Sequence, residues 1–304
     1  MPIPSSDIDP YTEAYFDDPF PAHEALRDAG PLVRLDRYGV WAVARYQQVR
    51  AVLMDWQSFS SARGAGLADF KKETPWRLPS LVLETDPPLH DRTRKVLDRV
   101  LSPAAMRRLR ARFAAAAEIL VDELLALREF DAIPDLAEAF PLTVFPDAVG
   151  MPKENRRFLL PYGNMVFNSF GPRNAWFEAA VKDAAPVIAW VQAQSQRAAL
   201  APDGFGAAIH AAADAGELSA EEAPVVVRSV LTAGVDTTVR ASVRHSIAWR
   251  GSRRNSSACA PIRGSPAPRS RRRCASKARC RPSSAPPRAP PTSAASRSVK
   301  AKRC

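Results

Sequence analysis

The composition of this 304-residue chain changes abruptly near residue 243, and the change limits which part can fold. Residues 244–304 contain 17 Lys and Arg, no Asp or Glu, and a single aromatic residue, Trp249. Such a segment cannot bury enough apolar surface to offset the entropy of ordering it. Residues 1–243 hold 26 basic and 32 acidic residues and are rich in Ala, Leu, Val and Phe. We therefore expect one globular unit over residues 1–243 and a disordered basic tail over residues 244–304.

Apolar periodicity predicts that the globular unit is mainly α-helical with a small β element. The expected helices cover residues 21–29, 46–54, 90–101, 104–127, 136–149, 154–170, 175–196 and 219–243. Alternating residues over 32–43 predict a short hairpin. The last helix, 219–243, is apolar almost all round, so it must run through the interior of a large fold.

The sequence also indicates a cellular setting. The first residues, Met-Pro-Ile-Pro-Ser-Ser-Asp, have neither the basic nor the apolar part of a secretory signal. No run of about 18 apolar residues occurs, so no membrane span is predicted. Residues 1–243 contain no cysteine and therefore no disulfide framework. We expect a cytoplasmic protein.

The segment Ala233-Gly234-Val235-Asp236-Thr237-Thr238 interrupts the apolar helix with residue types that disfavour a helix interior. Asp and Thr side chains compete for backbone hydrogen bonds, and Gly costs about 1 kcal/mol relative to Ala. Residue types alone leave two explanations open. The segment is either a functional site, or a Thr bonded to an upstream carbonyl beside a Gly that permits close packing.

A second pattern is Asp86-Pro87-Pro88-Leu89-His90-Asp91-Arg92-Thr93-Arg94. His90 and Arg94 are four residues apart, so they share one face of a helix. Taken alone, such a pair is usually no more than a solvated face of a helix.

Together these segments resemble bacterial cytochromes P450. The first is similar to the family's oxygen-binding segment and the second to its Asp-Pro-Pro-x-His-x-x-x-Arg segment, and Leu-Ser-Pro, Ala-Glu-Ala-Phe-Pro and Val-Gly-Met-Pro fall in the family's order. The resemblance implies a monooxygenase with haem b, supplied with electrons by a ferredoxin and its reductase. The implied site residues are His90 and Arg94 at a haem propionate, Ala233 and Gly234 beside dioxygen, and Asp236 and Thr237 in oxygen activation.

A narrower resemblance concerns the substrate. Residues 70–77, 166–172 and 228–229 are similar to P450s that oxidise para-substituted benzoates by hydroxylation or O-demethylation. The resemblance implies an aromatic carboxylic acid held by Arg77, Ser80, Arg228 and Ser229, with Phe167 and Phe170 flanking its ring. The two phenylalanines are also spaced as ordinary core residues of a helix.

The family pattern stops near residue 243. A Glu-x-x-Arg helix and the Phe-x-x-Gly-x-x-x-Cys-x-Gly loop, whose thiolate ligates the haem iron, are absent from residues 244–304. The sequence therefore offers no proximal metal ligand. The acid-free tail is typical of GC-rich coding DNA read out of frame, and a one-nucleotide shift lets residues 270–275 encode Glu-Glu-Ala-Leu-Arg. We expect a truncated P450 with a frameshift between residues 241 and 244, without activity and with little haem retention.

Two other functions stay open. Seventeen positive charges could bind phosphate, as a nucleic-acid-binding arm does. The tail has no interleaved aromatic residues for stacking on bases, so no nucleic-acid partner is expected. Alternatively, residues 1–243 form a haem-free, P450-like scaffold that binds a ligand without catalysis.

Overall fold

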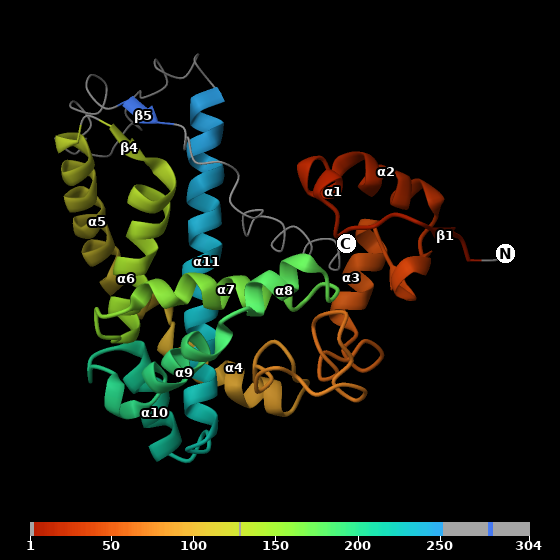
Figure 1. The fold of residues 1–304 in the computed structure, drawn as a ribbon. Helices are drawn as coiled ribbons and strands as arrows, with labels where there is room; N and C mark the ends of the chain where they lie inside the picture. The colour runs from red at the N-terminus through yellow and green to blue at the C-terminus, as the bar shows by residue number, and fades with distance from the viewer. Residues whose placement is uncertain (1–2, 128, 252–278, 282–304) are drawn as a thin grey trace.

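The computed structural model describes residues 3–127, 129–251 and 279–281 (Figure 1). Its helices are α1 Glu13–Asp17, α2 Phe20–Ala29, α3 Tyr46–Met54, α4 Leu89–Val100, α5 Pro103–Ala126, α6 Ala139–Val149, α7 Leu159–Asn168, α8 Ala175–Val181, α9 Ala184–Gln194, α10 Phe205–Asp214 and α11 Glu222–Gly251. The strands are β1 Ser5–Ser6, β2 Val33–Leu35, β3 Val40–Ala42, β4 Glu129–Asp131 and β5 Arg279–Arg281. The prediction of a mainly α fold with a small β element is confirmed.

Helix α11 runs through the middle of the helical part and packs against α6, α7 and α10 (Figure 1). Its start is fixed by a capping box, in which Glu222 N donates to Ser219 Oγ at 3.2 Å and Ser219 N donates to Glu222 Oε2 at 2.8 Å. Val226, Val227 and Leu231 are almost completely buried. The expected central helix is therefore present, and its apolar circumference explains its place.

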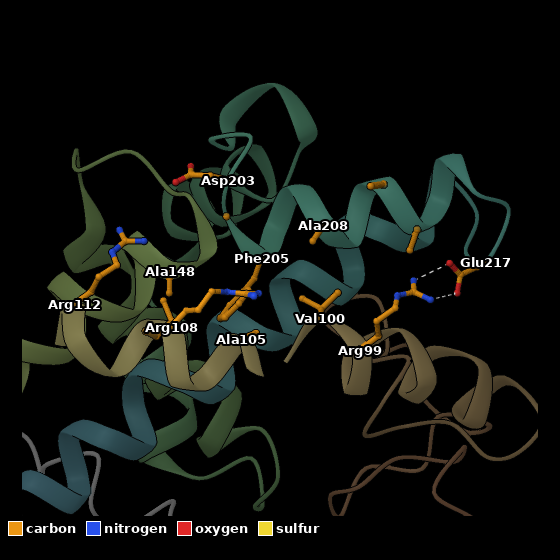
Figure 2. Close-up of a pocket in the computed structure, with 14 residues that line it drawn as sticks. Arg99, Val100, Ala105, Arg108, Arg112, Ala148, Asp203, Phe205, Ala208 and Glu217 are labelled. Carbon is orange, nitrogen blue, oxygen red and sulfur yellow. Dashed lines mark hydrogen bonds and ion pairs between the residues drawn. The ribbon is translucent and has the colours of Figure 1, made fainter. Parts of the chain in front are cut away.

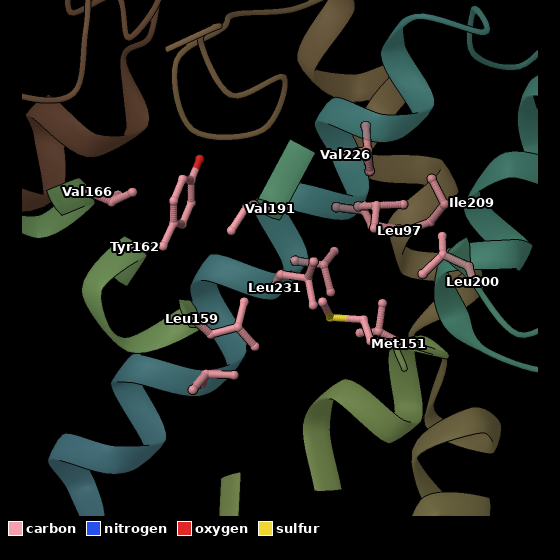
Figure 3. Close-up of a cluster of buried hydrophobic side chains, with 14 of the residues drawn as sticks. Leu97, Met151, Leu159, Tyr162, Val166, Val191, Leu200, Ile209, Val226 and Leu231 are labelled. Carbon is pink, nitrogen blue, oxygen red and sulfur yellow. The ribbon is translucent and has the colours of Figure 1, made fainter. Parts of the chain in front are cut away.

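The main hydrophobic core forms where α4, α7, α9 and α10 meet α11 (Figure 3). Leu97, Tyr162, Val191, Ile209 and Leu231 converge there from these five helices. Complete burial of one such aliphatic side chain stabilises the fold by roughly 1.5–3 kcal/mol. The core therefore anchors α11 against four other helices and fixes the position of its remaining surface.

The small sheet confirms the predicted hairpin. β2 and β3 pair antiparallel, with Arg34 opposite Trp41, and β1 pairs with β2 in parallel. Gly39 closes the connection in the left-handed conformation at φ 60°, which glycine adopts without strain. The strand order is β1-β2-β3, and a second, two-stranded sheet joins β4 to β5.

Three expected helices are divided or begin with another type of helix in the structure. Residues 175–196 form two helices, α8 and α9, because Asp183 takes the left-handed conformation at φ 59° and ends the helical path. The expected helix over 136–149 begins as a π-helix, Ala132–Glu138, before α6. Residues 154–170 begin as a 3₁₀ turn, Arg156–Phe158, so the α-helix α7 starts only at Leu159.

The change in composition at residue 243 does not coincide with the end of a structural element. Helix α11 continues to Gly251, eight residues past its expected end. Arg279–Arg281 form strand β5, in which Cys280 lies opposite Phe130 of β4. The expected disorder of the tail otherwise falls on residues 252–278 and 282–304, which lie outside the described residues.

Candidate functional site

Four residues implied for a carboxylate site meet between α11 and the segment that precedes α4. Ser80 Oγ lies 3.0 Å from Ser229 Oγ, although the two residues are 149 positions apart. Arg228 Nη2 donates to the carbonyl oxygen of Leu78 at 2.6 Å. Arg77 Nη1 donates to the same oxygen at 3.0 Å, so both guanidinium groups meet at one acceptor. The structure therefore brings all four residues into one cluster.

An internal carboxylate, which the sequence analysis missed, completes this cluster. Glu84 accepts from Arg77 Nη1 at 2.9 Å and Nη2 at 3.0 Å, a bidentate pair. The backbone N–H of Ser80 also donates to Glu84, at 2.7 Å. The side chains of Arg77 and Glu84 are 9% and 2% exposed. A sequence signal existed, because Glu84 is the single charged residue after the apolar run Leu81-Val82-Leu83.

The cluster holds more positive than negative charge. Among the described residues, Arg228 forms no ion pair of its own, and Glu84 is already paired with Arg77. Burial lowers the pKa of Arg228, the neighbouring Tyr162 hydroxyl opposes this shift, and the charge of Arg77 adds to it. Burial also raises the pKa of Tyr162, so its hydroxyl stays neutral. Two guanidinium groups thus face one carboxylate.

Aromatic side chains border the cluster. Trp76 lies 6.0 Å from Tyr162 between ring centroids, and Arg77 lies over the Trp76 ring at 5.7 Å. Phe167 and Phe170 are edge to face, with centroids 6.2 Å apart, and Phe170 is buried in the main core. A cavity beside Arg77 and Phe170 measures about 20 Å³, which suits one water molecule and no aromatic ring. A ring could enter only if these side chains moved.

The polar segment of α11 contains a buried ion pair. Arg240 Nε donates to Asp236 Oδ2 at 2.8 Å, and the two side chains are 11% and 6% exposed. Arg240 also lies over the Phe167 ring at 5.3 Å. Helix α7 approaches closely here, since a Cβ added to Gly163 would lie 3.0 Å from the Asp236 Cβ. Asp236 is thus a carboxylate held inside the protein beside one of the implied ring contacts.

Ala233 and Thr237 lie on an exposed side of α11, one turn apart. Thr237 Oγ1 donates to the Ala233 carbonyl at 2.7 Å, which is the bonding that the non-functional explanation required. Gly234 faces a different neighbour, because a Cβ there would lie 2.1 Å from the Phe145 ring of α6. Gly234 therefore has a packing role of its own, separate from the open surface at Ala233.

His90 and Arg94 both lie on α4 and are partly exposed. His90 Nδ1 lies 3.0 Å from Asp91 Oδ1, and Arg94 Nε lies 2.9 Å from Asp98 Oδ1. These neighbours are solvent-exposed, so both basic groups can exchange them for another anion at small cost.

The chemistry of these side chains fits the cofactor that the sequence resemblance implies. The basic groups of His90 and Arg94 suit a haem propionate, and Ala233 is a small side chain on the exposed side of α11. Among the described residues, no group of three or more His, Cys, Asp or Glu could hold a metal ion.

A larger hollow than the cavity beside Arg77 lies elsewhere. A groove of about 540 Å³ separates α4 and α5 from α10, with Arg108 and Arg112 on one side (Figure 2). Arg99 and Glu217 close one end through two hydrogen bonds of 2.7 Å. None of the site residues implied by the sequence lines this groove. Its size alone therefore gives no reason to place the chemistry there.

Solved structures define the class of protein that has this fold. The crystal structure of CYP109E1 from Bacillus megaterium in complex with testosterone matches with a TM-score of 0.62 at 21% identity, covering 82% of this chain and 66% of that chain. Epothilone B-bound cytochrome P450epoK matches with a TM-score of 0.58 at 24% identity, covering 83% and 65%. The fold is that of the cytochromes P450.

Curated relatives give the family from sequence. Cytochrome p450 CYP199A2 of Rhodopseudomonas palustris is 58% identical over 238 residues, which are 78% of this chain and 58% of that protein. Epothilone C/D epoxidase of Sorangium cellulosum is 29% identical over 255 residues, 78% of this chain and 59% of that protein. No family model matches the chain. The chain carries the N-terminal portion of a bacterial cytochrome P450 and belongs to that family, and it spans less than two thirds of these relatives.

Within residues 3–127, 129–251 and 279–281, no helix is both long enough and apolar enough to cross a bilayer.

Proposed function

We propose that residues 1–243 form the oxygen- and substrate-facing part of a monooxygenase that oxidises para-substituted benzoates. The buried cluster of Arg77, Ser80, Arg228 and Ser229 carries this proposal. A buried carboxylate needs positive charge and several hydrogen-bond donors, because its desolvation is otherwise costly. This cluster offers two guanidinium groups and two hydroxyls, with positive charge in excess.

The Ser80 and Ser229 hydroxyls would donate to a ligand after rotating away from their present acceptors. Ser229 Oγ donates to the Val225 carbonyl at 2.9 Å, so the Ser80 hydroxyl proton points to Ser229. Either proton can turn towards a carboxylate, since a hydroxyl rotates freely about its C–O bond. The ring of the ligand would lie against Phe167 and Phe170, whose faces and edges favour an aromatic partner. The para substituent would then point away from the anchoring groups.

The family's cofactor, haem b, would supply the activation of dioxygen when bound. His90 and Arg94 would bind one propionate through charge-assisted hydrogen bonds. Asp236 and Thr237 would move protons from the protein interior to the exposed side of α11. For this, the Thr237 hydroxyl would leave the Ala233 carbonyl, and Asp236 would partly release Arg240.

A ferredoxin and its reductase would deliver electrons to such an enzyme in the cytoplasm. We propose that the chain as written is inactive, because none of Cys259, Cys274, Cys280 and Cys304 lies in the family's haem loop. A reduced carbon-monoxide difference spectrum should therefore show no thiolate-type Soret band. A normal band would refute the frameshift. So would sequencing of this gene that finds an unbroken frame through codon 304 with no nucleotide slip relative to close relatives.

Calorimetric titration of the 304-residue chain with 4-methoxybenzoate tests the substrate class. We expect saturable binding, at least tenfold weaker binding of the neutral 4-methoxybenzamide, and loss of benzoate binding in Arg228→Met. The control is Arg157→Met, which removes an exposed arginine paired with Glu138. Equal affinity for the acid and the amide, or no binding of either, would overturn the proposal.

A further inference from the structure

The position of Glu84 inside the anion-binding cluster is unexpected for a site that should hold a ligand's carboxylate. Its two oxygens accept three hydrogen bonds, two from Arg77 and one from the amide of Ser80. A charge this deeply buried is tolerated only with close to ideal partners. Glu84 has them, so the plane of the Arg77 guanidinium and the backbone at Ser80 are both fixed by one side chain.

The charges in the cluster show why Glu84 does not take the place of the ligand's carboxylate. The ionisable groups that face one another here are Arg77, Arg228, Glu84 and Tyr162. Tyr162 is neutral, and Glu84 neutralises one of the two guanidinium groups. One positive charge is left over in a buried place, where an uncompensated charge is costly. The cluster with Glu84 in place is therefore complementary to one further negative charge.

Arg77 can still donate to a ligand while it is held by Glu84. A guanidinium has five N–H donors, and Glu84 and the Leu78 carbonyl together accept three hydrogen bonds from Arg77. The remaining donors include Nε–H, whose direction is set once Glu84 holds Nη1 and Nη2 and so fixes the plane of the guanidinium. Arg77 is thus oriented to donate to a second acceptor.

We propose that Glu84 is a positioning residue that holds Arg77 and Ser80 ready and leaves the site one positive charge, matched to a singly charged carboxylate. This inference rests on the proposed function for its ligand. It assigns Glu84 no contact with the ligand itself.

The sign of one substitution distinguishes positioning from simple competition. Glu84→Gln makes the site more positive, so electrostatic attraction alone predicts tighter binding of 4-methoxybenzoate. If Glu84 positions Arg77, the same change weakens binding at least tenfold in a calorimetric titration of the full chain. The matched control is Glu217→Gln, which removes the same charge from an exposed bidentate pair with Arg99. We expect less than a twofold change there. Equal or tighter binding in Glu84→Gln would overturn the inference.

A second measurement needs no ligand. Thermal unfolding of Arg77→Met, Glu84→Gln and the double variant forms a double-mutant cycle. We expect the double variant to unfold at a higher temperature than additive losses predict, because each single change leaves a buried partner without its mate. Strict additivity would overturn the positioning role. The cycle can show coupling between Arg77 and Glu84 while the wild-type chain binds no benzoate. That result would refute the proposed function, and it would still support the conclusion that Glu84 holds Arg77 in place.

Discussion

Two bidentate arginine–glutamate pairs have almost the same geometry and very different surroundings. Arg77 and Glu84 are joined by hydrogen bonds of 2.9 and 3.0 Å, and Arg99 and Glu217 by two of 2.7 Å. The first pair is 9% and 2% exposed, whereas the second is 56% and 37% exposed. The shorter hydrogen bonds belong to the exposed pair, so distance does not rank the two.

Burial decides what each pair can do. Water screens the charges of Arg99 and Glu217, and such pairs contribute little to stability. At Arg77 and Glu84 the charges have already lost their hydration, so each depends on the other. An exposed pair can open without consequence, and a buried pair fixes the geometry around it. The buried pair also lies in the cluster that carries the proposed function.

The largest expected effect comes from breaking the buried pair. Glu84→Gln leaves Arg77 without a counter-charge in the interior, and loss of one partner of such a pair costs about 3–5 kcal/mol. Urea unfolding followed by circular dichroism measures this cost. A loss below about 1 kcal/mol would show that water reaches Arg77 and that the two pairs are equivalent.

The two pairs also show what sequence can and cannot supply. The depth of α11 was predictable, because the turns that precede Asp236, with Val226, Val230 and Leu231 among their residues, are apolar almost all round. The prediction that Ser80 and Ser229 share one site came from a family resemblance. Spacing could not supply it, since 149 positions separate the two residues. Glu84 was missed because it lies in an irregular segment. The apolar run Leu81-Val82-Leu83 before it was a signal of burial, but no periodicity indicated that the carboxylate itself faces inward. Its burial is a property of the tertiary fold.

The sequence did not settle other parts of the fold, each for a local reason. Helix α10, in the sequence Phe-Gly-Ala-Ala-Ile-His-Ala-Ala-Ala-Asp, has too few large apolar residues for a clear stripe. The break before α9 depends on Asp183 in a left-handed conformation. Pro186, in the first turn of α9, is a sequence signal for a new helix start that the prediction of one continuous helix overlooked. The role of Gly234 in packing against Phe145 was one of two explanations, and only the contact with α6 shows it.

A third ion pair, Asp236 with Arg240, lies between the two extremes. Its partners are 6% and 11% exposed, but they are four residues apart on one helix, and Arg240 has the Phe167 ring as a second partner. We therefore expect Asp236→Asn to cost about 2 kcal/mol, as for a hydrogen bond to a charged group. Urea unfolding measures it, with Asp98→Asn at an exposed position of α4 as the control. If Asp236→Asn lowered the free energy of unfolding as much as Glu84→Gln does, the contact of Arg240 with the Phe167 ring would not compensate for the lost carboxylate.

The smallest effect is expected at the exposed pair, where pH and salt provide the sharpest test. Arg99 lowers the pKa of Glu217, chiefly through hydrogen bonding, and Glu217 raises the pKa of Arg99. A carboxyl whose pKa is lower in the folded state contributes stability above its unfolded pKa. That contribution is lost as the pH falls through the folded pKa.

Because both groups are exposed, we expect Glu217→Gln to leave the thermal midpoint at neutral pH nearly unchanged. The small difference from wild type should vanish in acid and in about 1 M salt, where screening is nearly complete. A large, salt-independent loss at neutral pH would mean that the groove beside α10 shields this pair from water, and the contrast with Arg77 and Glu84 would fail.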